Sequence, residues 1–164
     1  MEKLNISLAK EEQIDEIMSV YAFAREFMAK TGNPNQWGKT YPEKETLLED
    51  IKNNRLFTVV SDGEIVGAFM FYVGIEPTYK IIRGAWQNDE EYGVIHRVAS
   101  GGKAKGVFSA LLDFCLTKTN HLRIDTHHDN VVMQNVLAKY GFTKCGIIYL
   151  ANGDERIAYE KTVQ

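Results

Sequence analysis

A glycine-rich turn between two apolar runs is the first feature of this 164-residue sequence that could do chemistry. It lies within HRVASGGKAKGVFSALL, residues 96–112, where an amphipathic run follows the turn. Backbone N–H groups at the start of a helix bind phosphate without help from side chains. Gly106 would leave the first helical turn open to an anion, and Lys103 and Lys105 add positive charge beside it. An ordinary strand-to-helix loop has the same composition, so the turn alone does not decide between a phosphate site and a simple connection.

Two other phosphate sites are excluded by the residues of this turn. A P-loop requires G-x-x-x-x-G-K-[ST], and Gly101 and Gly106 have its spacing, but valine and phenylalanine follow Gly106. The dinucleotide fingerprint G-x-G-x-x-G requires a glycine where Lys103 stands. Asp125 lies about twenty residues further on, where that fold keeps its ribose acid, but only one helix and two tightly connected strands are expected after it. Those elements cannot build a doubly wound sheet.

The elements that must position these residues follow from the periodicity of apolar side chains. Helical spacing predicts helices over 11–30, 43–53, 105–118 and 130–140, the last capped by Asn130 and ended by Gly141. Strands are predicted over 4–8, within 55–74 around the Asp62-Gly63 turn, and over 92–100, 121–127, 145–150 and 156–161. Residues 84–91 are expected to form a polar loop. The order β-α-α-β-β-β-α-β-α-β-β indicates an α+β fold, in one domain over residues 1–164.

Two motifs stand in register within these elements. KAKGVF, from Lys103 to Phe108, opens the third helix, and NVVMQNVLAKYGF, from Asn130 to Phe142, forms the fourth. This arrangement resembles the GNAT superfamily of acyl-CoA-dependent N-acyltransferases, whose motifs there are [QR]-x-x-G-x-[GA] and N-x-x-A-x-x-x-Y-x-x-x-G-F. The resemblance covers nearly the whole chain. It implies a mixed, mostly antiparallel central β-sheet flanked by helices, with splayed central strands.

The resemblance also implies a site for acetyl-CoA. In the family, the main chain corresponding to 104–109 binds the pyrophosphate, and the strand edge corresponding to 96–98 pairs with the pantetheine arm. Asn130 and Asn135 would contact coenzyme A from the following helix. The residues assigned to coenzyme A in this way are His96, Arg97, Val98, Lys103, Ala104, Lys105, Gly106, Val107, Phe108, Ser109, Asn130 and Asn135.

Three residues depart from the family pattern. Lys103 stands where glutamine or arginine is usual, which keeps a positive charge but loses the planar fork of arginine. Phe108 places a bulky ring where glycine or alanine is usual, on the first helical turn. Leu137 stands where the family often has the tyrosine that protonates the departing thiolate. Phe108 and Leu137 keep open the alternative of a protein that binds coenzyme A as a sensor or scaffold, without turnover.

The resemblance implies direct attack of an amine on the acetyl thioester in a ternary complex, which needs a base, an oxyanion donor and a leaving thiolate. The backbone N–H of Val98 is the expected oxyanion donor, and thiols titrate near ~8.5, so a thiolate leaves without a strong acid. Asp125 occupies a strand position where some family members place a glutamate base, and His127 shares its strand face. His96 ranks behind Asp125 as a base. Tyr140 is a substitute acid one helical turn on, or alternatively a packing residue.

The acceptor pocket is expected from parts of the chain outside these motifs. Trp37 and Tyr41, in the connection GNPNQWGKTY, could form its wall or a local core under a long loop, and Trp86 could help to close it. We expect the acceptor to be a primary amine on a small molecule or a peptide.

Bulk composition limits the other partners. The formal net charge is −3, and basic residues are scattered, which argues against nucleic acid. The longest apolar runs are too short to span a membrane, and the first residues lack a signal core, so we expect a cytoplasmic protein. His127, His128 and Asp129 adjoin, but no second ligand cluster has zinc spacing, so no metal is expected. A homodimer remains open.

Overall fold

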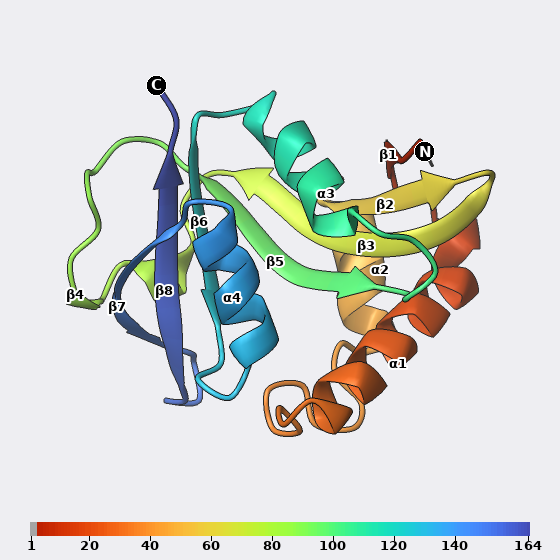
Figure 1. Cartoon of the computed structure of the whole chain (residues 1–164), viewed down its shortest axis with the longest axis horizontal. Coiled ribbons are helices and arrows are strands. Elements are labelled where there is room, and N and C mark those ends of the chain that lie inside the picture. The colour runs from red at the N-terminus through yellow and green to blue at the C-terminus, as the bar shows by residue number, and fades with distance from the viewer. Residues whose placement is uncertain (1–2) are drawn as a thin grey trace.

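An eight-stranded sheet forms the centre of the computed structural model, which describes residues 3–164 (Figure 1). The strands lie in the spatial order β1-β2-β3-β5-β6-β8-β7-β4, and all neighbours are antiparallel except β5 and β6. Their bounds are β1 (Asn5–Leu8), β2 (Leu56–Ser61), β3 (Glu64–Val73), β4 (Arg83–Gly84), β5 (Gly93–Ser100), β6 (His121–Thr126), β7 (Thr143–Tyr149) and β8 (Glu155–Thr162). The predicted α+β class and the mostly antiparallel sheet are therefore confirmed.

Four α-helices and two short 3-10 turns complete the fold of residues 3–164. They are η1 (Glu11–Gln13), α1 (Ile14–Lys30), α2 (Lys44–Lys52), η2 (Pro77–Tyr79), α3 (Val107–Leu116) and α4 (Val131–Lys139). Helices α1 and α2 pack their apolar sides with β2 and β3 in one core cluster, which includes Ile17, Leu47 and Leu56. Helices α3 and α4 contribute Leu111 and Leu137 to a second cluster. In the described part of the chain, no helix has both the length and the apolar character needed to span a membrane.

The predicted order of elements is confirmed, with three local corrections. The segment expected to be a loop from 84 onward begins with β4, a two-residue strand that pairs with β7. The first helix begins with a 3-10 turn rather than as a single α-helix. Helix α3 begins at Val107 and not at Lys105, because Gly106 has a φ of +79° and cannot belong to a right-handed helix.

The central strands splay, as the resemblance implies. β5 and β6 are paired only from Gly93 to Ile95 and from Leu122 to Ile124, although β5 continues to Ser100. Beyond Ile95, β5 curves away from β6 toward α1 (Figure 1). Because pairing ends there, the edge of β5 that faces β6 has no strand partner from His96 onward within the described part of the chain.

A β-bulge at Arg97 bends β5 at the point where the two strands part. The register with β3 runs from Met70 opposite His96 to Ala68 opposite Ala99, so two residues of β5 lie opposite one residue of β3. Arg97 itself has a φ of +51°, a left-handed conformation that costs a non-glycine residue about 1–2 kcal/mol.

Three contacts hold Arg97 in this conformation. Its guanidinium makes a two-point ion pair with Asp50 of α2, at 2.8 and 2.7 Å, and also donates to the Tyr41 hydroxyl at 2.9 Å. The Tyr21 hydroxyl of α1 donates to its carbonyl oxygen at 2.6 Å. Helices α1 and α2 therefore fix the bend in β5, and the side chain of Arg97 serves the fold at this position.

Candidate active site

A cavity of about 770 Å³ opens where β5 and β6 part. One wall comes from the separated strands, including His96, Val98 and Asp125, and another from the connection between α1 and α2. Helix α4 and the turn between β7 and β8 line the remaining sides. The cavity thus collects side chains from parts of the chain that lie far apart in sequence, which is typical of a ligand site.

The N-terminus of α3 borders this cavity and fits an anion. The first N–H groups of a helix have no intrahelical partner, and the first turn of α3 carries no acidic residue. Among residues 3–164, and apart from the two chain neighbours of Gly106, no atom lies within 4 Å of the position that a Cβ would take there, so the space above the turn is open. Val107 and Phe108 line the cavity, whereas Ala104, Lys105, Gly106 and Ser109 are not among its lining residues. These features suit a pyrophosphate bound by main-chain N–H groups from outside the cavity.

Lys103 and Phe108, which depart from the family pattern near the start of α3, both contact other parts of the chain. The Lys103 ammonium pairs with the carboxylate of Glu64, on the side of the hairpin between β2 and β3. The ring of Phe108 packs against Tyr140 at 5.4 Å and Phe142 at 6.5 Å, between α3 and α4. The bulk of Phe108 is therefore directed toward α4, and it does not fill the open space above Gly106. Tyr140 does not line the cavity, and its ring lies against Phe108.

Helix α4 presents an apolar face to the cavity. Asn130 caps the helix by accepting the Met133 N–H at 3.0 Å and donates to the Gln36 side chain at 3.0 Å, which ties α4 to the connection between α1 and α2. The α4 residues that line the cavity are Val132, Met133 and Val136. Asn135 is not among them, and Leu137 is completely buried in the core. The position where the family often has a tyrosine thus faces away from the cavity in this chain.

Four polar side chains form a chain of contacts along the cavity. Glu76 Oε1 lies 2.8 Å from His96 Nε2, and His96 Nδ1 lies 3.8 Å from Asp125 Oδ2. The Tyr79 hydroxyl donates to the same oxygen of Asp125 at 2.7 Å. Glu76, His96 and Asp125 line the cavity, while Tyr79 is buried behind them. The imidazole of His96 therefore lies between two carboxylates and faces the space where β5 and β6 separate.

The charges in this chain follow from burial and hydrogen bonding. Partial burial raises the pKa of Glu76, but hydrogen bonds from His96 and from the Thr78 N–H outweigh it, so the pKa lies below its ordinary value. Glu76 is thus ionised at neutral pH and accepts the Nε2–H of His96. Burial first, and Asp125 next, raise the pKa of Tyr79 well above its ordinary value, so the phenol stays a donor. Because Nε2 contacts Glu76, Nδ1 is the ring nitrogen of His96 that faces Asp125.

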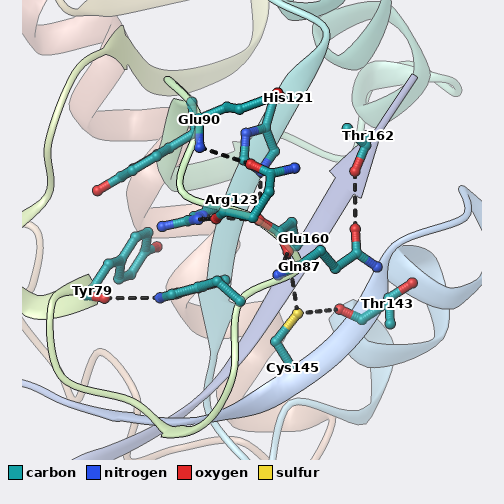
Figure 2. A network of polar contacts seen from close by, with 12 residues as sticks. Tyr79, Gln87, Glu90, His121, Arg123, Thr143, Cys145, Glu160 and Thr162 are labelled. Carbon is teal, nitrogen blue, oxygen red and sulfur yellow. Dashed lines mark hydrogen bonds and ion pairs between the residues drawn. The ribbon is translucent and has the colours of Figure 1, made fainter. Parts of the chain in front are cut away.

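Glu76 and Tyr79 were not among the site residues expected from the sequence, because no motif marks the segment between β3 and β5 in which both lie. That segment is held in place by polar contacts with Glu160 of β8 (Figure 2). The side chain of Glu160 is completely shielded from solvent. Its carboxylate accepts the Gln87 N–H at 2.7 Å and the Arg123 Nε–H at 3.0 Å, and it also contacts His121. Burial raises the pKa of Glu160, but these hydrogen bonds outweigh it and hold the pKa below its ordinary value.

Trp86 links Arg123 to Tyr79 but does not line the cavity. Its indole N–H donates to the Tyr79 carbonyl at 2.8 Å, and its ring lies 4.1 Å from the guanidinium of Arg123. Trp86 therefore supports Tyr79 from behind. The sequence does contain a local signal for a helical turn at Glu76. This acid directly precedes Pro77, and its side chain accepts the Thr78 N–H as the N-terminal cap of η2.

The two aromatic residues expected beside an acceptor do line the cavity. The Trp37 ring lies 5.8 Å from Tyr21 and 6.2 Å from Tyr41, and Tyr41 accepts a hydrogen bond from Arg97. Both residues therefore form a wall and a local packing cluster at the same time. The two interpretations of these aromatic residues are compatible.

His127 lies beyond the end of β6, outside the cavity lining. Its ring stacks on His128 at 4.3 Å, and its Nδ1 accepts the Asp129 N–H at 3.0 Å. Burial, followed by the charge of Arg156, lowers the pKa of His127. Potential ligand atoms of His127, His128 and Asp129 lie within 4.8 Å of one another, but the hydrogen bond from the main chain occupies Nδ1 of His127.

Comparison with solved structures finds relatives over the whole length of the chain. It is similar to an acetyltransferase of the GNAT family from Streptococcus agalactiae 2603, with 31% sequence identity and a TM-score of 0.87, over 98% of this chain and 96% of that chain. GNAT-family acetyltransferases from Bacillus cereus ATCC 10987 (18% identity, TM-score 0.65, 99% of each chain) and Listeria monocytogenes 4b F2365 (14% identity, TM-score 0.71, 98% and 95%) share the fold. No protein-family model and no curated protein matches the chain.

Proposed function

Because this chain belongs to the GNAT family of acetyltransferases, we propose that it transfers the acetyl group of acetyl-CoA to a primary amine by direct attack in a ternary complex. The observation that supports this proposal most strongly is the position of His96. It lies between Glu76 and Asp125 at the point where the central strands separate, beside the free edge of β5.

Two features of the chain fit coenzyme A. The open N-terminus of α3 offers unpaired N–H groups and a positive dipole end to a pyrophosphate. The edge of β5 from His96 onward offers main-chain groups to the amide groups of a pantetheine arm. Acetyl-CoA supplies a thioester, which is an activated acyl group with a good leaving group.

We assign the base to His96 and the binding of the incoming ammonium to Asp125. This assignment reverses the order expected from the sequence, where Asp125 ranks first. Glu76 fixes the imidazole by accepting its Nε2–H, in the way that a carboxylate orients a catalytic histidine. An ammonium group beside His96 Nδ1 and Asp125 Oδ2, which are 3.8 Å apart, can contact both. His96 takes its proton, and the neutral nitrogen attacks the acyl carbon.

The chain also supplies groups for the later stages. The bulge at Arg97 directs the main chain of β5 into the gap, where the Val98 N–H can stabilise negative charge that develops on the acyl oxygen. The new C–N bond forms as the C–S bond breaks, and the second proton that the amine nitrogen must lose to become an amide passes to the departing thiolate sulfur. The cavity face of α4 is apolar and supplies no acid. The thiolate can leave without one, because the pKa of its conjugate thiol is only about 8.5.

The apolar face of α4 favours the alternative of a coenzyme A sensor without turnover. Release of free thiol from acetyl-CoA, followed while a panel of primary amines is added, separates the two functions. The transferase releases thiol only when an acceptor is present, and the His96→Gln variant loses at least tenfold in kcat. Binding of acetyl-CoA with no amine-dependent thiol release would contradict the proposal and support the sensor.

A further inference from the structure

Arg156 is an enclosed positive charge on the wall of the cavity. It lies near the start of β8, only 7% of its surface is exposed, and it lines the same cavity as His96 and Asp125. Its Nη1 donates to the main-chain oxygen of Glu155 at 2.8 Å. Among residues 3–164, no carboxylate lies within 4.0 Å of its guanidinium. A guanidinium has five N–H donors, so most of its binding capacity is unused.

The other enclosed arginines of the fold show what is missing. Arg97 makes a two-point ion pair with Asp50, and Arg123 pairs with the buried Glu160 at 3.0 Å. Enclosed charges are normally paired in this way, since an unpaired one is costly. Asp154 also lines the cavity near this end of β8, but its carboxylate accepts from Asn152 and lies beyond ion-pair distance of Arg156. Arg156 is therefore prepared for a negative charge that the chain itself does not provide.

The position of Arg156 relates this charge to the reacting amine. Ala158 of β8 lies opposite Asp125 of β6, and Arg156 is two residues earlier on the same strand. Alternation places Arg156 and Asp125 on the same face of the sheet. The Cα atoms of such diagonal neighbours on adjacent strands are about 7–8 Å apart. The cavity thus offers Asp125 to an ammonium and, at the diagonal position on β8, the guanidinium of Arg156 to an anion.

This charge pattern matches a small zwitterion. We propose that the acceptor carries a carboxylate close to its primary amine, as amino acids do, and that Arg156 binds this carboxylate and so determines acceptor specificity. The inference rests on the proposed acetyl transfer. Arginine binds carboxylates through two parallel hydrogen bonds, which give both affinity and orientation. A peptide or polyamine acceptor would place an uncharged or positive group against Arg156.

The test compares acids with matched amides. The standard L-amino acids and their α-carboxamides are offered with acetyl-CoA, and kcat/KM is measured from thiol release. We expect the best amino acid to exceed its amide by about tenfold or more in the wild-type protein. In Arg156→Gln the preference should fall below about threefold, and Arg156→Lys should lie between them. Arg83→Gln, at an exposed arginine on β4, is the matched control and should keep the full preference.

Equal use of acids and amides by the wild-type protein, or an equal loss for both in Arg156→Gln, would overturn the inference while leaving the acetyl transfer intact. If no amine releases thiol, the proposed function fails and binding decides the inference separately. Thermal shifts are then measured with the same amino acids and amides. Stabilisation by an acid but not its amide, lost in folded Arg156→Gln, supports the anion site; equal shifts for acid and amide overturn it.

Discussion

Replacement of Gly106 by glutamate should weaken the binding of coenzyme A by about 20- to 600-fold. The glycine directly precedes α3, and a side chain added there would point into open space. A carboxylate about 6 Å from a doubly charged pyrophosphate costs about 1.4 kcal/mol in water and about 2.8 kcal/mol at half that dielectric constant. Competition of the carboxylate for the N–H groups of the helix adds about 0.3–1 kcal/mol.

Backbone strain must be separated from this electrostatic effect. Gly106 has a φ of +79°, so any L-residue there loses about 1–2 kcal/mol of folding stability. Gly106→Gln shares this strain and nearly the same bulk but lacks the charge. Gly153→Glu, at a φ of +90° in the turn between β7 and β8, adds the same charge and similar strain away from α3.

Calorimetric titration with coenzyme A, at low and at high salt, measures the effect. We expect the glutamate variant to bind much more weakly than the glutamine variant, with a smaller difference at high salt because the repulsion is screened. Gly153→Glu should bind normally. Equal affinities of the wild-type protein and a folded Gly106→Glu variant would refute the assignment of the pyrophosphate to the start of α3.

Three further predictions concern the residues behind the site. Glu76→Gln should lower kcat by about tenfold to a hundredfold with little change in the acceptor KM, because it removes the group that orients His96; unchanged kcat would exclude that role. Glu160→Gln should lower the free energy of unfolding by about 3–5 kcal/mol, since it leaves Arg123 unpaired. Because its folded pKa lies below the ordinary value of about 4.3, Glu160 stabilises the fold above that pH and loses this effect as pH falls through the folded pKa. Urea unfolding of the wild-type protein should therefore show a steeper loss on acidification than unfolding of Glu160→Gln. Leu137→Tyr should lose about 1–3 kcal/mol of stability and gain no turnover, because the ring must enter a filled core.

The elements of the fold were predictable because each carries a local signal. Asp62-Gly63 connects β2 to β3, and Asn130 caps α4 as expected. The splay of the central strands came from the family resemblance and not from the residues themselves. β4 was not predicted, because a strand of two residues is too short to show a periodic pattern of apolar side chains. Its pairing with β7 depends on the close approach of Gly84 to Gly146.

The site was predictable only in part, since its geometry depends on distant contacts. His96, Asp125 and Trp37 were expected near the reaction and do line the cavity. Tyr79 reaches Asp125 across 46 residues of sequence, and no local pattern reveals that contact. The rotation of α4 about its axis buries Leu137 and turns Val136 to the cavity, which a sequence motif does not specify.

The unpaired charge of Arg156 also depends on tertiary structure. The sequence contains Asp154 and Glu155 beside it, and either could have been its partner. In the fold, the guanidinium contacts the main-chain oxygen of Glu155 instead, while the side chain of that glutamate lies near Arg83. Only the three-dimensional arrangement shows that, among residues 3–164, this guanidinium has no carboxylate within ion-pair distance.

Transfer of a labelled acetyl group tests the central claim most directly. The protein is mixed with isotopically labelled acetyl-CoA and a panel of amino acids and other primary amines, and the protein and the small molecules are then examined by mass spectrometry. The account predicts label on the amine nitrogen of an acceptor, unlabelled protein, and loss of the product in His96→Gln. Label retained covalently on the protein, or found only in free acetate, would contradict direct transfer to an amine.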